Sequence, residues 1–351
     1  MAIKSKELAG LLGVSAATVS LVLNHKPGIS DELRNTLLER IREMGYGYMI
    51  REALSEGGQT PFQGTNAICY VLLSEYPDEM TEASFFPTVI EGAEREARFQ
   101  GYSFSIVHMY GEKGRRLREC LSPRHYSGMI VYAKSLDEDT KKQLDETEIP
   151  YIVIDCCDPL LRVSSVTVNN RQGVEAAIRY LYGKGHRKIG YVSSGRSYGS
   201  LSERGRCFRY AMEEMGLAVE PDQFIDTGKI GEGAQKYLEK LWKKEQAPPT
   251  ALLVENDVLA ISVYRALNRA GYRIPEDVSV IGFEGRSICT LLEPTLTTMR
   301  VPRRLLGRAL MMLLRNKMDL ASRSLEDVPV RVEVNAELVE MESVAQVRQE
   351  Q

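Results

Sequence analysis

Four polar side chains stand where buried apolar runs end or helical segments begin. Asp155 and Glu284 come directly after apolar runs, Asn256 follows another run closely, and Arg204 lies near the start of a helical segment. A planar guanidinium can fork onto sugar hydroxyls or a carboxylate, and carboxylates and amides pair with hydroxyl groups. These residue types predict a site that binds a small molecule through hydrogen bonds.

The charges at these positions favour a neutral, sugar-like ligand. A phosphate would meet Asp155 and Glu284 as like charges, with only Arg204 to offset them. Phe86 is a further candidate, because its ring can stack on a sugar ring.

Each of these residues also has a structural interpretation. Asp155 can stabilise a turn, and Asn256 or the adjacent Asp257 can cap a helix. Phe86 can form a hydrophobic staple at the start of a helix. Arg204 can be a surface arginine in a charged helix. Both interpretations stay open at this point.

Residue patterns typical of catalysis or metal binding are absent from the sequence. There is no GxSxG, P-loop or GxGxxG motif, and the carboxylates are scattered. The four histidines have neither metal nor triad spacing: His25, His108, His125 and His186. We therefore expect no catalytic residue, no metal and no cofactor.

The segment 8–24 has the spacing of a helix-turn-helix, which places its second helix in a DNA major groove. Ala9 is small where two helices cross, Gly13 suits a turn that needs positive φ, and Ser15 can cap the second helix. The alternative is an ordinary αα-hairpin. The positions expected to be buried are Leu8, Leu12, Val14, Val19 and Val22.

A third helix is predicted after the motif. Ser30 caps it, and Gly45 ends it. Its apolar stripe is formed by Leu33, Leu37, Leu38, Ile41 and Met44. The helix-turn-helix predicts DNA contacts from Ser15, Ala16, Ala17, Thr18, Ser20, Leu21, Asn24 and His25.

After residue 45 the character of the chain changes twice. Residues 46–61 contain a short possible helix from Met49 to Leu54, followed by the Gly-Gly- and Pro-containing stretch 55–61, and are interpreted as a hinge or linker. From residue 62 onward, apolar strands alternate with amphipathic helices, a rhythm that predicts parallel sheets covered by helices on both faces. Ligands of such sheets bind at the carboxyl ends of strands.

Composition bounds the class of protein. The 351 residues suit two or three domains, and a hydrophobic fraction of 43% supports real cores. With a net charge of −3, the chain as a whole does not have the charge of a polyanion-binding protein. The six cysteines lack zinc or CxxC spacing, and the N-terminus resembles no export signal, so we expect reduced thiols and a cytoplasmic location without a membrane segment.

Several segments in order make the chain resemble the LacI/GalR family of bacterial transcriptional regulators. The similar segments are 13–24, 84–94, 185–191, 203–208, 255–260 and 275–283. The resemblance implies an all-α helix-turn-helix head and a two-lobed, periplasmic-binding-protein-like α/β core with parallel sheets. It also implies a homodimer that binds double-stranded operator DNA and a small effector. On this basis Phe86, Asp155, Arg204, Asn256 and Glu284 are predicted to bind the effector.

The resemblance has local departures. Relatives usually carry polar residues at the positions of Ala16, Ala17 and Leu21. The leucine that would wedge into the minor groove, Leu54, comes one place early. Glu284 replaces a usual Asp and so changes the reach of that carboxylate.

The predicted domains follow from the resemblance. The head spans residues 1–45 and the hinge or linker 46–61. The N-terminal lobe takes 62–162 and 288–318, and the C-terminal lobe takes 163–287 and 319–345.

The predicted function is a transcriptional regulator, a repressor, whose operator affinity depends on a sugar-like effector bound between the lobes. Two alternatives are a cytoplasmic sugar-binding protein and a carbohydrate-active enzyme. Neither accounts for the helix-turn-helix, and the enzyme also lacks a catalytic constellation.

The side chains on the second helix of the motif predict the kind of DNA sequence that is read. Ala16, Ala17 and Leu21 can meet thymine methyl groups but cannot fork onto guanine. We expect A·T preference at the contacted steps, weaker than the roughly 1–3 kcal/mol of an arginine–guanine pair. Selection from randomised DNA measures this, and an invariant G read by residue 21 would contradict it.

Overall fold

The computed structural model describes residues 5–23, 28–43, 66–74, 85–110, 117, 121–133, 136–158, 160–195 and 199–347. The chain divides into two compact units, Met1–Pro61 and Phe62–Gln351. The predicted linker 46–61 and Leu54 lie outside the described residues, as do Asn24 and His25.

In the described part of the first unit there are three helices, α1 (Ser5–Leu12), α2 (Ala16–Leu23) and α3 (Asp31–Glu43). The turn between α1 and α2 contains Gly13 at φ +69°, where a side chain would be strained. Ser15 Oγ accepts the Thr18 N–H at 3.0 Å and Ser30 Oγ accepts the Leu33 N–H at 3.3 Å, so both expected N-caps form.

The core of this unit confirms most of the predicted apolar positions. The buried residues are Leu8, Ala9, Leu12, Val19, Val22, Leu23, Leu37, Leu38 and Ile41. Two expectations need correction: Leu33 is 42% exposed and Val14 is only partly buried. Leu33 lies in the first turn of α3, where it projects away from the core formed by the following turns.

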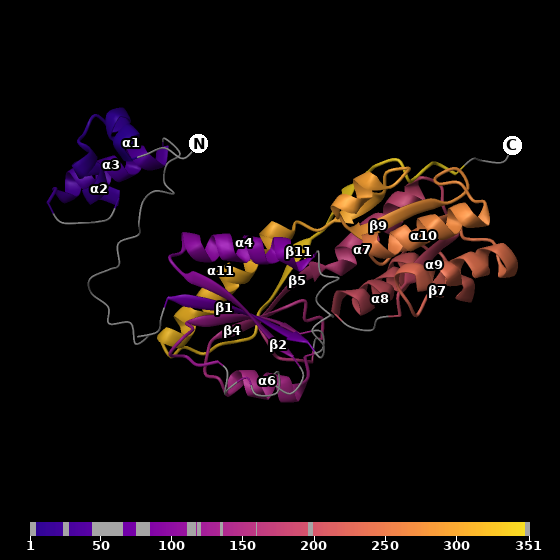
Figure 1. Ribbon diagram of the computed structural model, residues 1–351, viewed down its shortest axis with the longest axis horizontal. Helices are drawn as coiled ribbons and strands as arrows, with labels where there is room; N and C mark the ends of the chain where they lie inside the picture. Colours follow the sequence, from indigo (N-terminus) through magenta and orange to yellow (C-terminus); the bar gives the residue numbers. More distant parts are fainter. Residues whose placement is uncertain are drawn as a thin grey trace. The chain divides into compact units, whose positions relative to one another are not determined.

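The second unit consists of two lobes, each built on one six-stranded sheet (Figure 1). The strand order in the first sheet is β11-β5-β4-β3-β1-β2. These strands are β1 (Ala67–Ser74), β2 (Ser103–Tyr110), β3 (Gly128–Ala133), β4 (Tyr151–Ile154), β5 (Ser165–Asn169) and β11 (Arg331–Asn335). All pairings given for this sheet are parallel.

Helices cover both faces of the first sheet, α4 (Phe86–Phe99) and α11 (Arg303–Ser322) on one side and α6 (Glu138–Asp145) on the other (Figure 1). Alternation along β1 explains this arrangement. Ile68 and Tyr70 pack in the cluster that contains residues of α4 and α11, whereas Cys69 and Val71 pack with Leu144 of α6. Because both faces of β1 are buried, its sequence is a continuous apolar run and does not alternate with polar residues.

The second sheet has the strand order β12-β10-β9-β8-β6-β7. Its strands are β6 (Ile189–Ser193), β7 (Phe224–Asp226), β8 (Ala251–Val254), β9 (Ser279–Glu284), β10 (Thr297–Arg300) and β12 (Glu337–Val339). Its helices are α7 (Asn170–Gly183), α8 (Gly199–Glu214), α9 (Gly231–Lys240) and α10 (Asp257–Ala270). Only β12 is antiparallel among the described pairings of this sheet.

The sheets correct the predicted division into lobes. Strands β5 and β11 belong to the first sheet, although the prediction gave both to the C-terminal lobe, and β10 belongs to the second sheet, although it was given to the N-terminal lobe. The chain therefore passes between lobes after β5, after β10 and after β11. Sheet membership depends on which strand a segment pairs with, and a short strand carries no local mark of its partner.

Two glycines allow α4 and α11 to touch backbone to backbone. A Cβ on Gly92 would lie 2.5 Å from the Arg304 carbonyl oxygen, and one on Gly307 would lie 2.1 Å from the Val89 carbonyl oxygen. Such a close crossing brings the neighbouring side chains into the same core cluster, among them Val89 and Leu310.

Within the described residues, no helix is both long and apolar enough to cross a membrane.

The close crossing generates a stability prediction. Replacing Gly307 by Ala should destabilise the protein by about 1–3 kcal/mol, because the overpacking outweighs the helix propensity that alanine gains. Chemical denaturation measures the change.

Gly183→Ala is the control, since a Cβ there meets nothing within 4 Å. It should leave stability unchanged or raise it by up to about 1 kcal/mol. Equal destabilisation by the two substitutions would contradict the close crossing.

Candidate functional site

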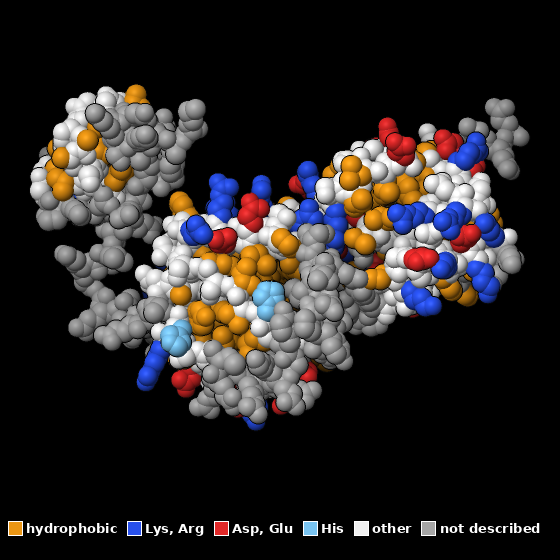
Figure 2. Space-filling model, viewed as in Figure 1, with side chains coloured by type: hydrophobic (Ala, Val, Ile, Leu, Met, Phe, Trp, Pro, Cys, Tyr) orange, Lys and Arg blue, Asp and Glu red, His pale blue; other side chains and the backbone are white. Residues whose placement is uncertain are grey.

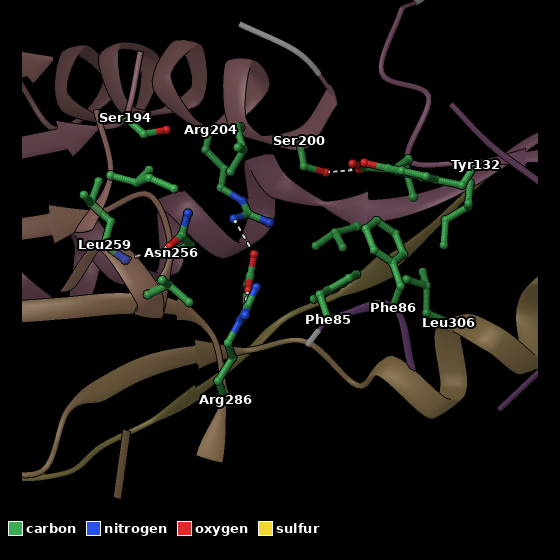
Figure 3. A pocket seen from close by; sticks show the side chains of 18 residues that line it. Phe85, Phe86, Tyr132, Ser194, Ser200, Arg204, Asn256, Leu259, Arg286 and Leu306 are labelled. Carbon is green, nitrogen blue, oxygen red and sulfur yellow. Dashed lines mark hydrogen bonds and ion pairs between the residues drawn. The ribbon is translucent and has the colours of Figure 1, made fainter. Parts of the chain in front are cut away.

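A cavity of about 150 Å³ lies within the second unit and is lined from both lobes (Figure 3). The five side chains predicted for the effector site all line it: Phe86, Asp155, Arg204, Asn256 and Glu284. They come from the start of α4, the end of β4, the second turn of α8, the start of α10 and the end of β9. The carboxyl ends of parallel strands thus collect residues that are distant in the sequence.

Arg204 is the most buried cation of the cavity, with 2% of its surface exposed. Its Nε donates to Asn170 Oδ1 at 2.9 Å, and its Nη1 donates to the Glu255 carbonyl oxygen at 2.7 Å. The guanidinium also lies 4.1 Å from the centre of the Phe283 ring. The interpretation of Arg204 as a surface arginine is therefore wrong.

Glu284 lies between two arginines. Its Oε1 is 3.6 Å from Arg204 Nη1, and its Oε2 accepts from Arg286 Nε at 2.5 Å. The side chain is buried, and its backbone has φ +105°, an unusual conformation outside glycine. The carboxylate is thus held by the protein itself, which the sequence did not indicate.

Asp155 follows β4 with φ +62° and reaches across to the other lobe. Its Oδ1 accepts a short hydrogen bond from the Ser200 hydroxyl in the first turn of α8. Burial raises the pKa of this carboxyl, while the Ser200 bond and the charge of Arg204 act in the opposite direction. Gly199 makes room, since a Cβ there would lie 2.8 Å from Asp155 Oδ2.

Asn256 caps α10, because its Oδ1 accepts the Leu259 N–H at 2.9 Å. Its Nδ2 donates to Glu255 Oε1 at 3.3 Å. The capping interpretation is confirmed, and the same side chain also lines the cavity. The two roles are compatible because an amide can make several hydrogen bonds.

Aromatic side chains of the first lobe form the other end of the cavity (Figure 3). The Phe86 ring lies 4.2 Å from the Tyr132 ring and 5.4 Å from the Phe85 ring, centre to centre. Leu306 of α11 lies beside them in the lining. The first lobe therefore contributes an aromatic and aliphatic wall besides Asp155, whereas the charged side chains Arg204, Glu284 and Arg286 come from the second lobe.

Several lining residues were missed from the sequence. Ser194 and Tyr132 stand at or just after the ends of β6 and β3, so the strand-end rule that selected Asp155 would also have found them. Ser200 was missed because it lies in the first turn of α8, on no strand end, and no sequence signal marks the start of this helix at Gly199. Arg286 follows Glu284 on a loop that has no periodic signal.

Ser194 has a property that sets it apart. Its side chain is buried, yet Oγ has no hydrogen-bond partner among the described residues. It lines the cavity on the same side as Asn256 and Leu259, away from the aromatic side chains (Figure 3). A buried hydroxyl without a partner is costly, so this atom is suited to a ligand or an ordered water.

Beneath Glu284 lies a second buried carboxylate, Asp257. It accepts from the Arg286 backbone N–H at 2.7 Å and from the Thr298 hydroxyl at 2.7 Å. Burial, followed by repulsion from Glu284, raises its pKa to about 6. Asp257 therefore supports the loop that carries Arg286.

The helix α2 presents small and apolar groups in the first unit. Ser15, Ala16, Ala17 and Ser20 are exposed, and Thr18 is partly exposed. Leu21 is only partly exposed, because its Cδ1 packs beside Gly28, so it is less available than predicted. Arg34 of α3 donates to the Leu21 carbonyl oxygen at 3.0 Å and so satisfies the end of α2.

Within the described residues, no group of three or more His, Cys, Asp or Glu side chains could hold a metal ion. The described cysteines are free thiols.

Comparison with known proteins gives two family matches. Residues 5–47 match the bacterial regulatory proteins of the lacI family, and residues 178–344 match the periplasmic binding protein-like domain. The HTH-type transcriptional repressor PurR of Aliivibrio salmonicida (strain LFI1238) is 27% identical over 306 residues, covering 86% of this chain and 88% of that protein. PurR of Vibrio cholerae serotype O1 (strain M66-2) is 28% identical over the same shares.

Solved structures show the same fold. The complex of the transcriptional regulator CelR with cellobiose has a TM-score of 0.70 at 23% identity and covers 97% of this chain and 100% of its own. The lac repressor dimer bound to operator and an anti-inducer has a TM-score of 0.68 at 19% identity and covers 98% and 100%.

The helix-turn-helix unit and the two-lobed core with a polar cavity define a ligand-responsive, DNA-binding transcriptional regulator. The chain thus joins a lacI-family DNA-binding domain to a periplasmic binding protein-like domain, and it is similar over most of its length to HTH-type transcriptional repressors.

The raised pKa of Asp257 predicts a pH dependence of stability. Because the pKa is about 6 in the fold and 3.8 ordinarily, the unfolded chain ionises first as pH rises. Below pH 3.8 the carboxyl is protonated in both states and Asp257 does not destabilise the fold. As the pH rises from 3.8 to about 6, the free energy of unfolding falls by about 3 kcal/mol.

Asp257→Asn should remove this loss, since its oxygen can accept from Arg286 N–H and its amide can donate to Thr298. Urea denaturation of both proteins at several pH values measures the effect. If the stability difference between variant and parent stays constant from pH 4 to pH 7, Asp257 does not titrate in this range.

Proposed function

We propose that this protein is a repressor whose affinity for operator DNA is controlled by a small, sugar-like effector in the cavity between the lobes. The single observation that carries the proposal is the convergence of Phe86, Asp155, Arg204, Asn256 and Glu284 on one cavity. The helix-turn-helix unit of the same chain would bind the DNA whose affinity the effector controls.

The charges in the cavity favour a neutral effector. Glu284 is paired with Arg204 and Arg286, which neutralises part of the positive charge that a phosphate would need. Asp155 adds another carboxyl on the opposite side. Hydroxyl groups suit what remains, because serine and asparagine side chains can both donate to and accept from them, and carboxylates can accept from them.

Known complexes support a sugar. CelR was solved with cellobiose, and a LacI family regulator of Enterococcus faecium, 23% identical with a TM-score of 0.65, was solved with ribose. The Phe85, Phe86 and Tyr132 side chains here offer faces on which a sugar ring can stack.

The proposal includes the assembly and setting of the protein. We infer a homodimer that binds a two-fold related operator, since symmetric half-sites match a symmetric dimer. Ser15, Ala16, Ala17, Thr18, Ser20 and Leu21 would contact the DNA, joined by Asn24, His25 and Leu54. The protein would act in the cytoplasm without catalytic activity, as its repressor relatives imply.

A thermal-shift screen against neutral sugars, sugar phosphates and nucleobases tests the ligand class. A ligand that binds only the folded protein raises the melting temperature by mass action. We expect a neutral sugar to do so and to change operator affinity in a gel-shift assay. Stabilisation by sugar phosphates alone would contradict the neutral class.

Ser194 provides the sharpest substitution. Ser194→Ala removes a hydroxyl that has no partner among the described residues, so stability should hold while affinity for the sugar identified in the screen falls roughly fivefold to tenfold. Isothermal calorimetry measures the affinity.

Ser262→Ala is the matched control. This serine is also buried, but its hydroxyl donates to the Gly231 carbonyl oxygen at 2.9 Å, away from the cavity lining. Its replacement should lower stability by about 1 kcal/mol and leave affinity unchanged. The reverse pattern between the two variants would show that Ser194 does not face the ligand.

A further inference from the structure

The first turns of α8 carry an acidic residue, Glu203, that lies outside the cavity lining. Both of its carboxylate oxygens are engaged. Oε1 is 3.1 Å from Arg331 Nη2, and Oε2 accepts from Asn170 Nδ2 at 2.6 Å. Glu203 therefore links two parts of the fold that are far apart in the sequence.

The contact with Arg331 crosses between lobes. Arg331 begins β11, which belongs to the first sheet, whereas Glu203 is on α8, which packs against the second. Only 31% of the Arg331 side chain and 20% of the Glu203 side chain are exposed, so solvent screens this ion pair incompletely. Strand β11 is also the segment after which the chain passes from the first sheet to β12 in the second.

The contact with Asn170 leads to the effector arginine. Asn170 is the first residue of α7, directly after the first passage of the chain between lobes, and only 1% of it is exposed. Its amide nitrogen donates to Glu203 Oε2 and, at 3.0 Å, to the Ser200 hydroxyl, while its amide oxygen accepts from Arg204 Nε. Glu203, the charged acceptor with the shorter of these two bonds, thereby orients, together with Ser200, the amide that holds Arg204.

We propose that Glu203 is both a latch between the lobes and a positioning residue for Arg204. Its pair with Arg331 favours the closed arrangement of the lobes, and its bond to Asn170 orients the guanidinium. The latch does not depend on the identity of the effector. Only the consequence for effector binding rests on the proposed function, so the tests below use protein without any added ligand.

The first test measures the separation of the lobes. Spin-labelled unnatural amino acids replace Asp139 of α6 and Arg265 of α10, which are both exposed. Double electron–electron resonance then measures the distance between the two labels, one on each lobe. Glu203→Gln and Arg331→Gln should each raise the ratio of open to closed molecules by about fivefold, as expected for losing one ion pair of the stronger kind. The double variant should open the lobes no further than either single variant.

Glu333→Gln is the matched control. Glu333 lies 3.0 Å from the same Arg331 Nη2, but both residues are on β11, so this pair does not join the lobes. Its loss should leave the distance distribution unchanged. Thermal melts of each variant verify that it is folded, and Arg331→Gln, on the other lobe, gives an independent result where Glu203→Gln folds poorly.

The second test addresses the positioning of Arg204. The Nε–H signal of Arg204, identified by its loss in Arg204→Lys, should exchange slowly with water because this proton is buried and bonded to Asn170. Glu203→Gln should speed that exchange, since Asn170 then loses the carboxylate that orients it. Glu333→Gln should not.

Unchanged lobe distances in Glu203→Gln would overturn the latch, as would equal opening by Glu333→Gln. Unchanged exchange of the Arg204 Nε proton would overturn the positioning role. Failure of every sugar in the screen would count against the proposed effector class and leave both of these results intact.

Discussion

The core depends on the burial of one cation. Arg204 has almost no contact with solvent, so its charge requires partners from the protein, and it finds them in Asn170, the Glu255 carbonyl oxygen and Glu284. These partners come from the first turn of α7, the segment after β8 and the end of β9. Satisfying a single guanidinium thus fixes the mutual positions of three elements of the second lobe around the cavity.

The sequence predicted the location of the site better than its internal bonding. Strand ends could be recognised from apolar runs followed by Asp155, Asn256 and Glu284, and parallel sheets bring such ends together. The ion pairs within the site could not be recognised from the sequence. Arg286 contacts Glu284 only because of the loop conformation, and no sequence pattern predicts that conformation. The same holds for the head, where caps were predictable but the partial burial of Leu21 depends on packing beside Gly28.

Lobe membership shows the same limit on a larger scale. For short strands such as β5, β10 and β11, the hydrogen-bond partners decide to which sheet each strand belongs. Their swapped assignment matters for function, because the passages of the chain between lobes follow these three strands. Residues that looked like ordinary strand ends, such as Asn169 and Asn335, in fact meet at 3.0 Å where the lobes join.

The bonding within the cavity also limits how an effector can act. Arg204, Glu284 and Asn256 already have protein partners, so a ligand gains less from them than from groups that lack such partners. The binding free energy of the ligand must therefore come largely from a hydrogen bond to Ser194, from stacking on the aromatic wall and from contacts made in the closed arrangement of the lobes. A ligand shifts an equilibrium only by its differential affinity for the two states. Contacts made from both lobes at once, as at Asp155 and Ser200, are therefore where an effector can distinguish the closed state from the open one.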